Sequence, residues 1–297
     1  MKDHCPLCSQ PARYVFKKSD YQYKRCTSCG TLFVANILDP QQVYPNYSEA
    51  YFEANSSKNK VSKERRGYPS YREAEESLIN SFDNKLKLIC RYINHGKLLE
   101  VGAAYGTFMS LANQYFRCTG LDVSAHAARM AREIYGLEVQ QGGIEQKTEF
   151  KENTFDVVAM WDVIEHLIQP IEALKEAYRV LKPGGMIFFS TDDANNWLPR
   201  LLGSKWWALA APLHICHFSK KGVEAAFCQA GEFEKIGFVS DKRVYGIGEI
   251  VSHFGVSYKN KLVLKIGKWL ERTALGSKSI TVNRPEQFIT FAQKKSL

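Results

Sequence analysis

The sequence lacks a run of about 18 consecutive apolar residues, the length that a helix needs to cross a bilayer. A membrane-spanning helix is therefore not expected. The residues after Met1 also form no apolar leader, which favours a cytoplasmic location. Hydrophobic residues nevertheless make up 45% of the 297 residues, enough for a sizeable core. A chain of this length forms one large domain with a small appendage, or two domains.

A second absence concerns the glycine-rich loop of dinucleotide-binding proteins. That loop requires Gly-x-Gly-x-x-Gly, and counted from Gly102 its second and third glycines would fall on Ala104 and Thr107. The chain instead contains Glu100-x-Gly102-x-x-x-Gly106 after a short apolar run. This pattern predicts a buried strand, a tight turn and the start of a helix. The carboxylate is poorly placed for a pyrophosphate and well placed for a ligand with an ammonium group.

Three later segments agree with this interpretation. A second strand is predicted to end at Asp122, where a carboxylate can accept both hydroxyls of a ribose. A further buried strand is predicted over 155–161, and residues 181–190 are predicted to contain a helix end, a Pro-Gly-Gly break and then another strand. In order and spacing these segments resemble the core of class I S-adenosylmethionine (SAM) methyltransferases. The family's usual middle glycine is Ala104 here.

The resemblance implies an α/β fold, a Rossmann-like sheet of seven strands whose last strand inserts antiparallel between strands five and six. A helix is expected from Ser219 to about residue 236, followed by a strand over 238–245. The last strand is expected from Glu286 to Gln293. A doubly wound domain with a different cofactor is the alternative.

The resemblance also assigns the contacts with SAM. The turn formed by Gly102, Ala104 and Gly106 would lie against the cofactor, with Glu100 at its methionine end and Asp122 on its ribose hydroxyls. The other assigned contacts are Val123, Gly143 and Ile144 at the adenine, and Trp161 and Asp162 beside the sulfonium. Ordinary core packing is the alternative for Val123 and Ile144.

Two Cys-x-x-Cys pairs stand near the N-terminus, Cys5 with Cys8 and Cys26 with Cys29. Four thiolates at this spacing can surround one Zn²⁺ tetrahedrally, which predicts a zinc ribbon over 1–40. With no open position, the zinc would be structural rather than catalytic. Disulfides and a redox Cys-x-x-Cys are the less favoured alternatives. The remaining cysteines, Cys90, Cys118, Cys216 and Cys228, are expected to be small buried apolar residues.

The chain is thus predicted to divide into the ribbon, a linker with N-terminal helices over 41–97, and a methyltransferase domain over 98–297. Residues 56–68 are polar and basic and are expected to form a mobile loop. A long insertion over 247–284 precedes the last strand and contains a basic amphipathic stretch from Lys261 to Arg272. We expect its Leu, Ile and Trp face to pack on the domain; a membrane-surface or partner-binding helix is the alternative.

Charge is distributed unevenly along the chain. The net charge of +9 divides into +6 over 1–97, −6 over 98–196 and +9 over 197–297. A basic surround of an acidic cofactor core suggests an anionic acceptor, such as a nucleotide-linked or lipid-linked sugar, or nucleic acid. A merely solvated basic surface is the alternative.

Three histidines are candidates for the group that removes a proton from the acceptor, because the pKa of histidine lies near neutrality. His166 follows Glu165, a pair often found in this methyltransferase group, and His214 and His217 share a Pro-x-His-x-x-His-Phe-Ser stretch. That stretch resembles a bacterial subgroup of polysaccharide and secondary-metabolite clusters, which implies a sugar or saccharide-linked acceptor. His214 is the first choice as base; the competing interpretation is that these histidines brace loops.

Two other functions compete with small-molecule methylation. Zinc modules occur in some RNA guanine methyltransferases, and the basic flanks would follow phosphates. The Asn/Asp-Pro-Pro-Tyr/Phe loop of exocyclic-amine methyltransferases is absent, since Trp161 and Asp162 stand there, although ring-nitrogen chemistry stays open. The third hypothesis is a SAM-binding scaffold without catalytic activity.

Overall fold

The computed structural model describes residues 2–37, 39, 43, 47, 75–257, 260–273, 276 and 278–296. The loop predicted over 56–68 and most of the predicted linker lie outside the described residues. Within the described part of the chain, no helix is long and apolar enough to cross a membrane.

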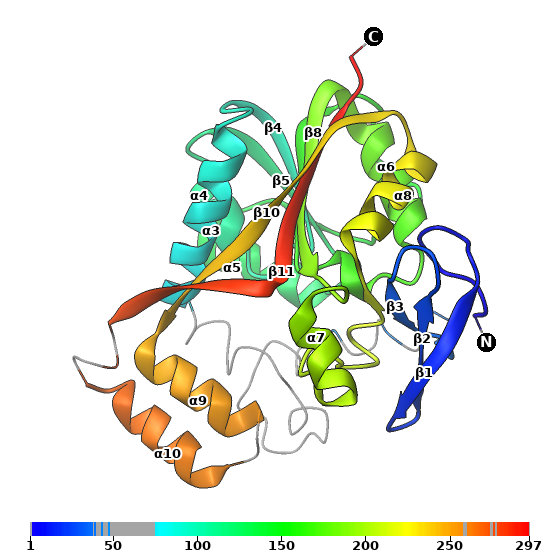
Figure 1. Cartoon of the computed structure of the whole chain (residues 1–297). Coiled ribbons are helices and arrows are strands. Elements are labelled where there is room, and N and C mark those ends of the chain that lie inside the picture. The colour runs from blue at the N-terminus through cyan, green and yellow to red at the C-terminus, as the bar shows by residue number, and fades with distance from the viewer. Residues whose placement is uncertain are drawn as a thin grey trace.

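A seven-stranded sheet forms the centre of the molecule (Figure 1). Its strands are β4 (Gly96–Val101), β5 (Phe116–Asp122), β6 (Val139–Gln141), β7 (Phe155–Trp161), β8 (Leu181–Asp192), β10 (Phe233–Gly246) and β11 (Ser279–Lys294). They lie in the order β10-β11-β8-β7-β4-β5-β6, and β11 is antiparallel to both of its neighbours. This arrangement confirms the predicted sheet, including the antiparallel insertion of the last strand.

Helices cover both faces of this sheet (Figure 1). On one face lie α3 (Glu75–Cys90) and α4 (Thr107–Ala112), whose apolar side chains pack with β4, β7 and β8. On the other lie α6 (Pro170–Val180) and α8 (Lys220–Ala230). The central strands are buried on both sides, so β7 is almost continuously apolar rather than alternating. A further helix, α5 (Ala125–Tyr135), connects β5 to β6.

Two elements near the C-terminus differ in length from the prediction. The helix that begins after Ser219 ends at Ala230 rather than near residue 236. It stops because the chain passes through Gly231 and Phe233 already pairs with Lys294 in the sheet. β10 therefore begins at Phe233, earlier than expected. β11 also begins earlier than expected, at Ser279, because it pairs with β10 as far as Gly246.

The segment between β10 and β11 contains two helices, α9 (Ile247–Ser257) and α10 (Lys261–Leu270). The expectation that α10 packs its Leu, Ile and Trp face on the domain was wrong. Leu262, Ile266 and Trp269 are exposed, and Gly267 is the buried residue of this helix. The helix packs through its smallest residue because glycine lets the α9 backbone approach closely at Ser252.

A second, smaller sheet is formed at the N-terminus by β1 (Ala12–Lys18), β2 (Tyr21–Cys26) and β3 (Leu32–Val34). Its fourth strand, β9 (Cys216–His217), comes from the segment after β8 and pairs with β3. We call these four strands the N-terminal sheet. Because β9 belongs to it, the cysteine-bearing segment and the large domain share backbone hydrogen bonds.

Candidate active site

The turn after β4, which we call the donor turn, spans Glu100 to Gly106. Gly102, Ala104 and Gly106 all have positive φ angles, 71°, 48° and 82°. A β-carbon at Gly102 would collide with Val163, so the turn packs closely against the loop after β7. This geometry exposes backbone at the carboxyl edge of the sheet, where ligands of open α/β sheets bind.

Glu100 is buried beside this turn, and its Oε2 atom has no hydrogen-bond partner among the described residues. Burial, with the nearby negative charge of Asp122, raises the pKa of Glu100 well above its usual value. A buried carboxyl group without a partner costs free energy unless a ligand supplies a donor or a positive charge. The ammonium group of SAM fits this requirement.

Asp122 links the donor turn to the end of β5. Its Oδ2 accepts the Ala104 N–H at 2.9 Å and its Oδ1 accepts the Ser124 N–H at 2.8 Å. Burial raises its pKa despite these two hydrogen bonds. Each carboxylate oxygen can accept more than one hydrogen bond, so both remain able to take a ribose hydroxyl.

The residues assigned to the adenine follow the neighbouring strands β5 and β6. Val123 and Gly143 are partly buried, whereas Ile144 is 1% exposed and belongs to the core. The sheet therefore brings all three to the edge that carries the donor turn, and Ile144 also packs as an ordinary core residue.

Trp161 and Asp162 end β7 among cations that sequence analysis did not single out. Lys85 of α3 lies with its Nζ 4.8 Å from the Trp161 ring centroid. Asp162 accepts a hydrogen bond from Ser190 Oγ at 2.9 Å and pairs with Arg243 of β10. Burial alone would raise the pKa of Asp162, but the charges of Arg243 and Lys85 outweigh it and lower the pKa. No sequence motif marks either cation, because each comes from a separate element.

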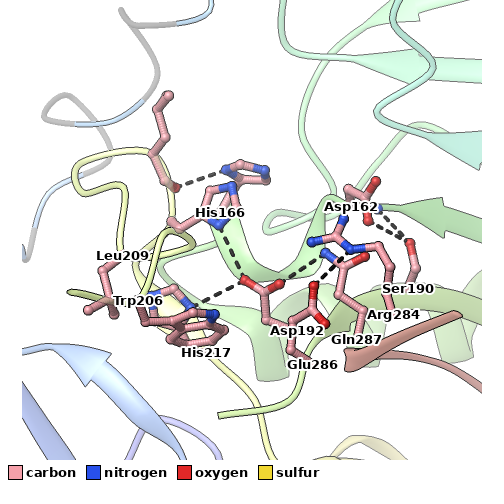
Figure 2. Close-up of polar contacts among 12 residues, drawn as sticks. Asp162, His166, Ser190, Asp192, Trp206, Leu209, His217, Arg284, Glu286 and Gln287 are labelled. Atoms are coloured by element: carbon pink, nitrogen blue, oxygen red, sulfur yellow. Dashed lines mark hydrogen bonds and ion pairs between the residues drawn. The ribbon is translucent and has the colours of Figure 1, made fainter. Parts of the chain in front are cut away.

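The three candidate histidines converge with two carboxylates; we call this group the histidine cluster. It consists of Glu165, His166, Asp192, His214 and His217. The His166 and His214 rings meet edge to face with centroids 4.7 Å apart. Asp192, the last residue of β8, lies with Oδ2 3.4 Å from Nδ1 of both His214 and His217 (Figure 2). Sequence analysis missed Asp192, although an acidic residue at the end of a parallel strand was an available signal.

The members of the cluster differ in exposure and in tautomer. His217 is fully buried under the Trp206 ring, 4.9 Å away between centroids, so it holds Asp192 rather than facing the outside. The Nδ1 atom of His166 donates a hydrogen bond to the Leu213 carbonyl at 2.9 Å. His214 is partly exposed. With a proton on Nδ1 directed to Asp192, the Nε2 atom of His214 carries a free lone pair.

Electrostatics within the cluster make His214 a stronger base than an ordinary histidine. Burial opposes the charged imidazole, but Asp192 and then Glu165 raise the pKa of His214 above its usual value. Burial and the charge of His214 lower the pKa of His166 to about 3, so His166 is neutral. Burial would raise the pKa of Asp192, yet the hydrogen bond with His217 and the ion-pair contact with His214 lower it.

Glu165 is the member of the cluster whose carboxylate is unsatisfied among the residues described. It is fully buried, and neither carboxylate oxygen has a hydrogen-bond partner within the described ranges. Burial and the charge of Asp162 raise its pKa to about 8. The donor atoms of Glu165, His166 and His214 lie within 4.8 Å of one another, as do those of Asp192, His214 and His217. These atoms are close enough to bind one cation. A proton on His214 balances the negative charge of Asp192 equally well, so the cluster does not require a metal.

Asp192 is also held by the neighbouring strand β11, where Gln287 pairs with it in register. Gln287 of β11 donates from Nε2 to Asp192 Oδ1 at 3.0 Å (Figure 2). Nearby, Arg284 pairs with Glu286 at 2.9 Å. Sequence analysis did not single out these residues, since the last strand carries no recognisable motif.

The four N-terminal thiols form a compact cluster. Their Sγ atoms are 3.6 Å apart for Cys5 and Cys29, 3.4 Å for Cys8 and Cys26, and 3.5 Å for Cys8 and Cys29. A tetrahedral Zn²⁺ with Zn–S bonds of about 2.3 Å places its sulfurs about 3.8 Å apart. A disulfide needs about 2.05 Å. The donor set and spacing thus fit one zinc ion, and all four ligand positions are filled by the chain.

The thiol cluster is physically connected to the histidine cluster. Ser219 Oγ, two residues after His217, donates to the Cys29 carbonyl at 2.6 Å. The Val34 N–H donates to the Ile215 carbonyl at 2.8 Å, and the Ile215 N–H donates to the Glu165 carbonyl at 3.0 Å. The backbone that carries His214 and His217 is therefore bonded on one side to the N-terminal sheet and on the other to the loop after β7.

Known proteins support the interpretation of this fold. The family model described as "Methyltransferase domain" matches residues 71–234. The ubiquinone biosynthesis O-methyltransferase of Sodalis glossinidius is 31% identical over 118 residues, which are 37% of this chain and 47% of the relative. That of Klebsiella pneumoniae is 32% identical over 139 residues, 44% of this chain and 57% of the relative. The chain thus spans about half the length of these curated relatives.

A solved structure shows the same fold. The SAM-dependent methyltransferase from Thermotoga maritima superposes with a TM-score of 0.51 at 20% identity, over 76% of this chain and 93% of that one. The family match covers more than half of the chain, and the strand order agrees with it. The chain therefore carries a class I SAM-dependent methyltransferase domain and belongs to the methyltransferase-domain family.

Proposed function

We propose that this protein transfers the methyl group of SAM to a hydroxyl group of a small acceptor, with His214 as the proton acceptor. The main observation that supports this proposal is the pairing of His214 with the buried Asp192 at the end of β8. This strand lies beside β7, and β7 lies beside β4, which leads into the donor turn. The two sites therefore lie on one edge of the sheet, so acceptor and cofactor can meet there.

Different residues of the chain hold different parts of the cofactor. SAM, when bound, supplies a methyl group activated by its sulfonium. Glu100 and Asp122 hold the ammonium and ribose groups, which fixes the direction in which the methyl group points. Trp161, at the end of β7, packs against Phe108 of α4 and Lys85 of α3.

On the acceptor side, the hydroxyl would donate its proton to Nε2 of His214 as its oxygen bonds to the methyl carbon, while the carbon–sulfur bond breaks and the sulfonium becomes a neutral thioether. Asp192 stabilises the imidazolium that results and keeps Nδ1 protonated, as a carboxylate does for a histidine base. His217 and Gln287 hold Asp192 in place. The proton leaves from His214 to solvent after transfer, since this ring is partly exposed.

The acceptor class rests on three lines of support. The relatives named above are O-methyltransferases, which favours a hydroxyl over a nitrogen. The resemblance of the segment around His214 and His217 to a saccharide-modifying subgroup favours a sugar, and the basic flanks favour one linked to a phosphate. We propose a nucleotide- or lipid-linked sugar, and one structural Zn²⁺ on Cys5, Cys8, Cys26 and Cys29.

The test is methyl transfer from labelled SAM by the zinc-loaded full chain. Nucleotide-linked sugars, lipid-linked sugars and RNA transcripts form separate arms, each analysed by mass spectrometry for the methylated atom. O-methylation of a sugar supports the proposal. Methylation of an RNA base would replace it with the RNA hypothesis, and SAM binding without transfer in any arm would favour a scaffold.

A further inference from the structure

One face of α10 is apolar and turned outward. At 3.6 residues per turn, Leu262, Ile266 and Trp269 share a face of the helix, opposite the buried Gly267. Gly267 packs against Ser252 of α9, so the attachment of α10 uses the other side. The three apolar side chains are 68%, 45% and 65% exposed, an unusual gathering for a helix surface in water.

Basic residues flank this apolar face. Lys261, Lys265, Lys268 and Arg272 are exposed, and they stand against a single acidic residue, Glu271, in this stretch. On the helix they form a stripe beside Leu262, Ile266 and Trp269. An apolar face with Trp and Leu, bordered by lysines, is the pattern of helices that lie in the interfacial plane of an anionic bilayer.

A second helix presents the same chemistry at the same edge of the sheet. In α7 (Trp197–Leu202), Trp197 and Leu201 stand one turn apart and are 63% and 75% exposed. This helix follows the carboxyl end of β8, and α9 and α10 follow the carboxyl end of β10, which runs parallel to β8. Figure 1 shows α7 and α10 beyond this edge.

We propose that the exposed faces of α7 and α10 form a docking face for the surface of an anionic lipid bilayer. Charge complementarity and the two tryptophans, which prefer the boundary between headgroups and acyl chains, carry this assignment. A protein partner fits less well, because lysine is depleted in protein–protein interfaces. Docking would turn the carboxyl edge toward the bilayer. A lipid-linked acceptor, which rests on the proposed function, would then enter from the membrane side.

The test is co-sedimentation of the zinc-loaded full chain with vesicles of phosphatidylcholine, with and without phosphatidylglycerol. One variant carries Ile266→Gln and Trp269→Gln, a second Trp197→Gln and Leu201→Gln, and a third Lys265→Gln and Lys268→Gln. The matched control carries Tyr115→Gln and Ile134→Gln. Both control side chains are exposed, and Tyr115 directly precedes β5, at the opposite edge of the sheet.

We expect the wild type and the control to bind the anionic vesicles, more weakly at high salt. Each of the three docking-face variants should bind about tenfold or more weakly. SAM affinity, measured by calorimetry, should be equal in all five proteins, which excludes misfolding. Vesicle binding needs no methyl acceptor, so a failure of this proposal is distinct from a failure of the proposed function.

Three results would overturn the proposal: no binding of the wild type to anionic vesicles, unchanged binding of the docking-face variants, or equal loss in the control. A stable dimer in sedimentation velocity that the α10 variant dissociates would show that a second copy of the chain covers this face instead.

Discussion

The donor side and the acceptor side of this site are built in different ways. The donor side uses β4, β5 and the turns directly after them, and its key contacts, such as Ala104 with Asp122, join neighbouring strands. The acceptor side gathers η3 (Ile164–His166), the end of β8, the segment before β9, and β11. A site made from two adjacent strands is determined by the sheet itself, whereas one made from distant segments needs additional support.

The N-terminal sheet provides that support. It accepts β9 as its fourth strand and bonds the chain around His214 and His217 through Val34 and Ser219. The donor turn is instead bonded to β5, through the Gly102 N–H on the Leu121 carbonyl and the Ala104 N–H on Asp122. A Zn²⁺ ion on the four cysteines, as proposed, would therefore support the acceptor side more than the donor side.

Removal of the zinc should have the largest effect. Structural zinc contributes on the order of 10 kcal/mol to the folding of small metal domains. A chelator, or Cys29→Ser, should therefore disorder the N-terminal sheet and speed amide hydrogen exchange of β9, while the exchange of β4 and β5 and the affinity for SAM stay near wild type. Exchange mass spectrometry and calorimetry measure both sides, and Cys228→Ser, at an exposed cysteine, is the control. Equal loss on the two sides would refute the separation.

Replacement of the proposed base should have the next largest effect. His214→Ala should lower kcat about 10²- to 10⁴-fold, because the acceptor hydroxyl loses its proton acceptor. The Kd for SAM should change less than twofold, since the donor turn is untouched. His95→Ala, at an exposed histidine near the opposite edge of the sheet, is the control. Undiminished turnover in His214→Ala would return this histidine to a purely structural role.

A donor-side substitution should show the reverse pattern. Asp122→Asn weakens the acceptors offered to the ribose hydroxyls and should raise the Kd for SAM about 10- to 100-fold, given about 1.5–3 kcal/mol for a hydrogen bond to a charged group. Hydrogen exchange of β9 should not change. Asp156→Asn, at the amino edge of β4 and β7, is the control. Wild-type affinity for SAM in Asp122→Asn would remove the ribose assignment.

The sequence predicted the donor side more completely than the acceptor side. The donor turn and the four-cysteine cluster were predictable because each is specified by residues close together in the chain, and the sheet order followed from the resemblance to the methyltransferase family. The SAM contacts at the adenine, such as Val123 and Gly143, stay predictions. Both residues lie at the expected edge of the sheet.

The acceptor side was only partly predictable. His166, His214 and His217 were found as candidates, but Asp192 and Gln287 were not. The pairing of their strands was predicted, whereas the convergence of these two side chains with His214 and His217 depends on the tertiary fold. The addition of β9 to the N-terminal sheet was equally invisible. The outward face of α10 was misassigned because amphipathicity shows that a helix has an apolar face and does not show what that face contacts.

The smallest expected effect concerns Glu165, whose pKa is raised to about 8 in the folded protein from the usual value near 4.5. The folded state then holds a proton that the unfolded state has released, so the stability of the wild type falls as pH rises between these values. Glu165→Gln cannot ionise and lacks this loss. Its Tm relative to wild type should therefore increase by a few degrees from pH 5 to pH 8, as thermal unfolding would show.

The control for this pH dependence is Glu224→Gln, at an exposed position on α8, whose Tm difference from wild type should not vary with pH. Substitutions of two buried glutamates, Glu100 and Glu165, then compare the donor side with the acceptor side directly. Glu100→Gln should weaken SAM binding if Glu100 holds the ammonium of the cofactor as proposed, whereas Glu165→Gln should leave SAM affinity unchanged. A loss of SAM affinity in Glu165→Gln would show that the histidine cluster and the donor turn act as one electrostatic unit, because Asp162 lies between them and raises the pKa of Glu165.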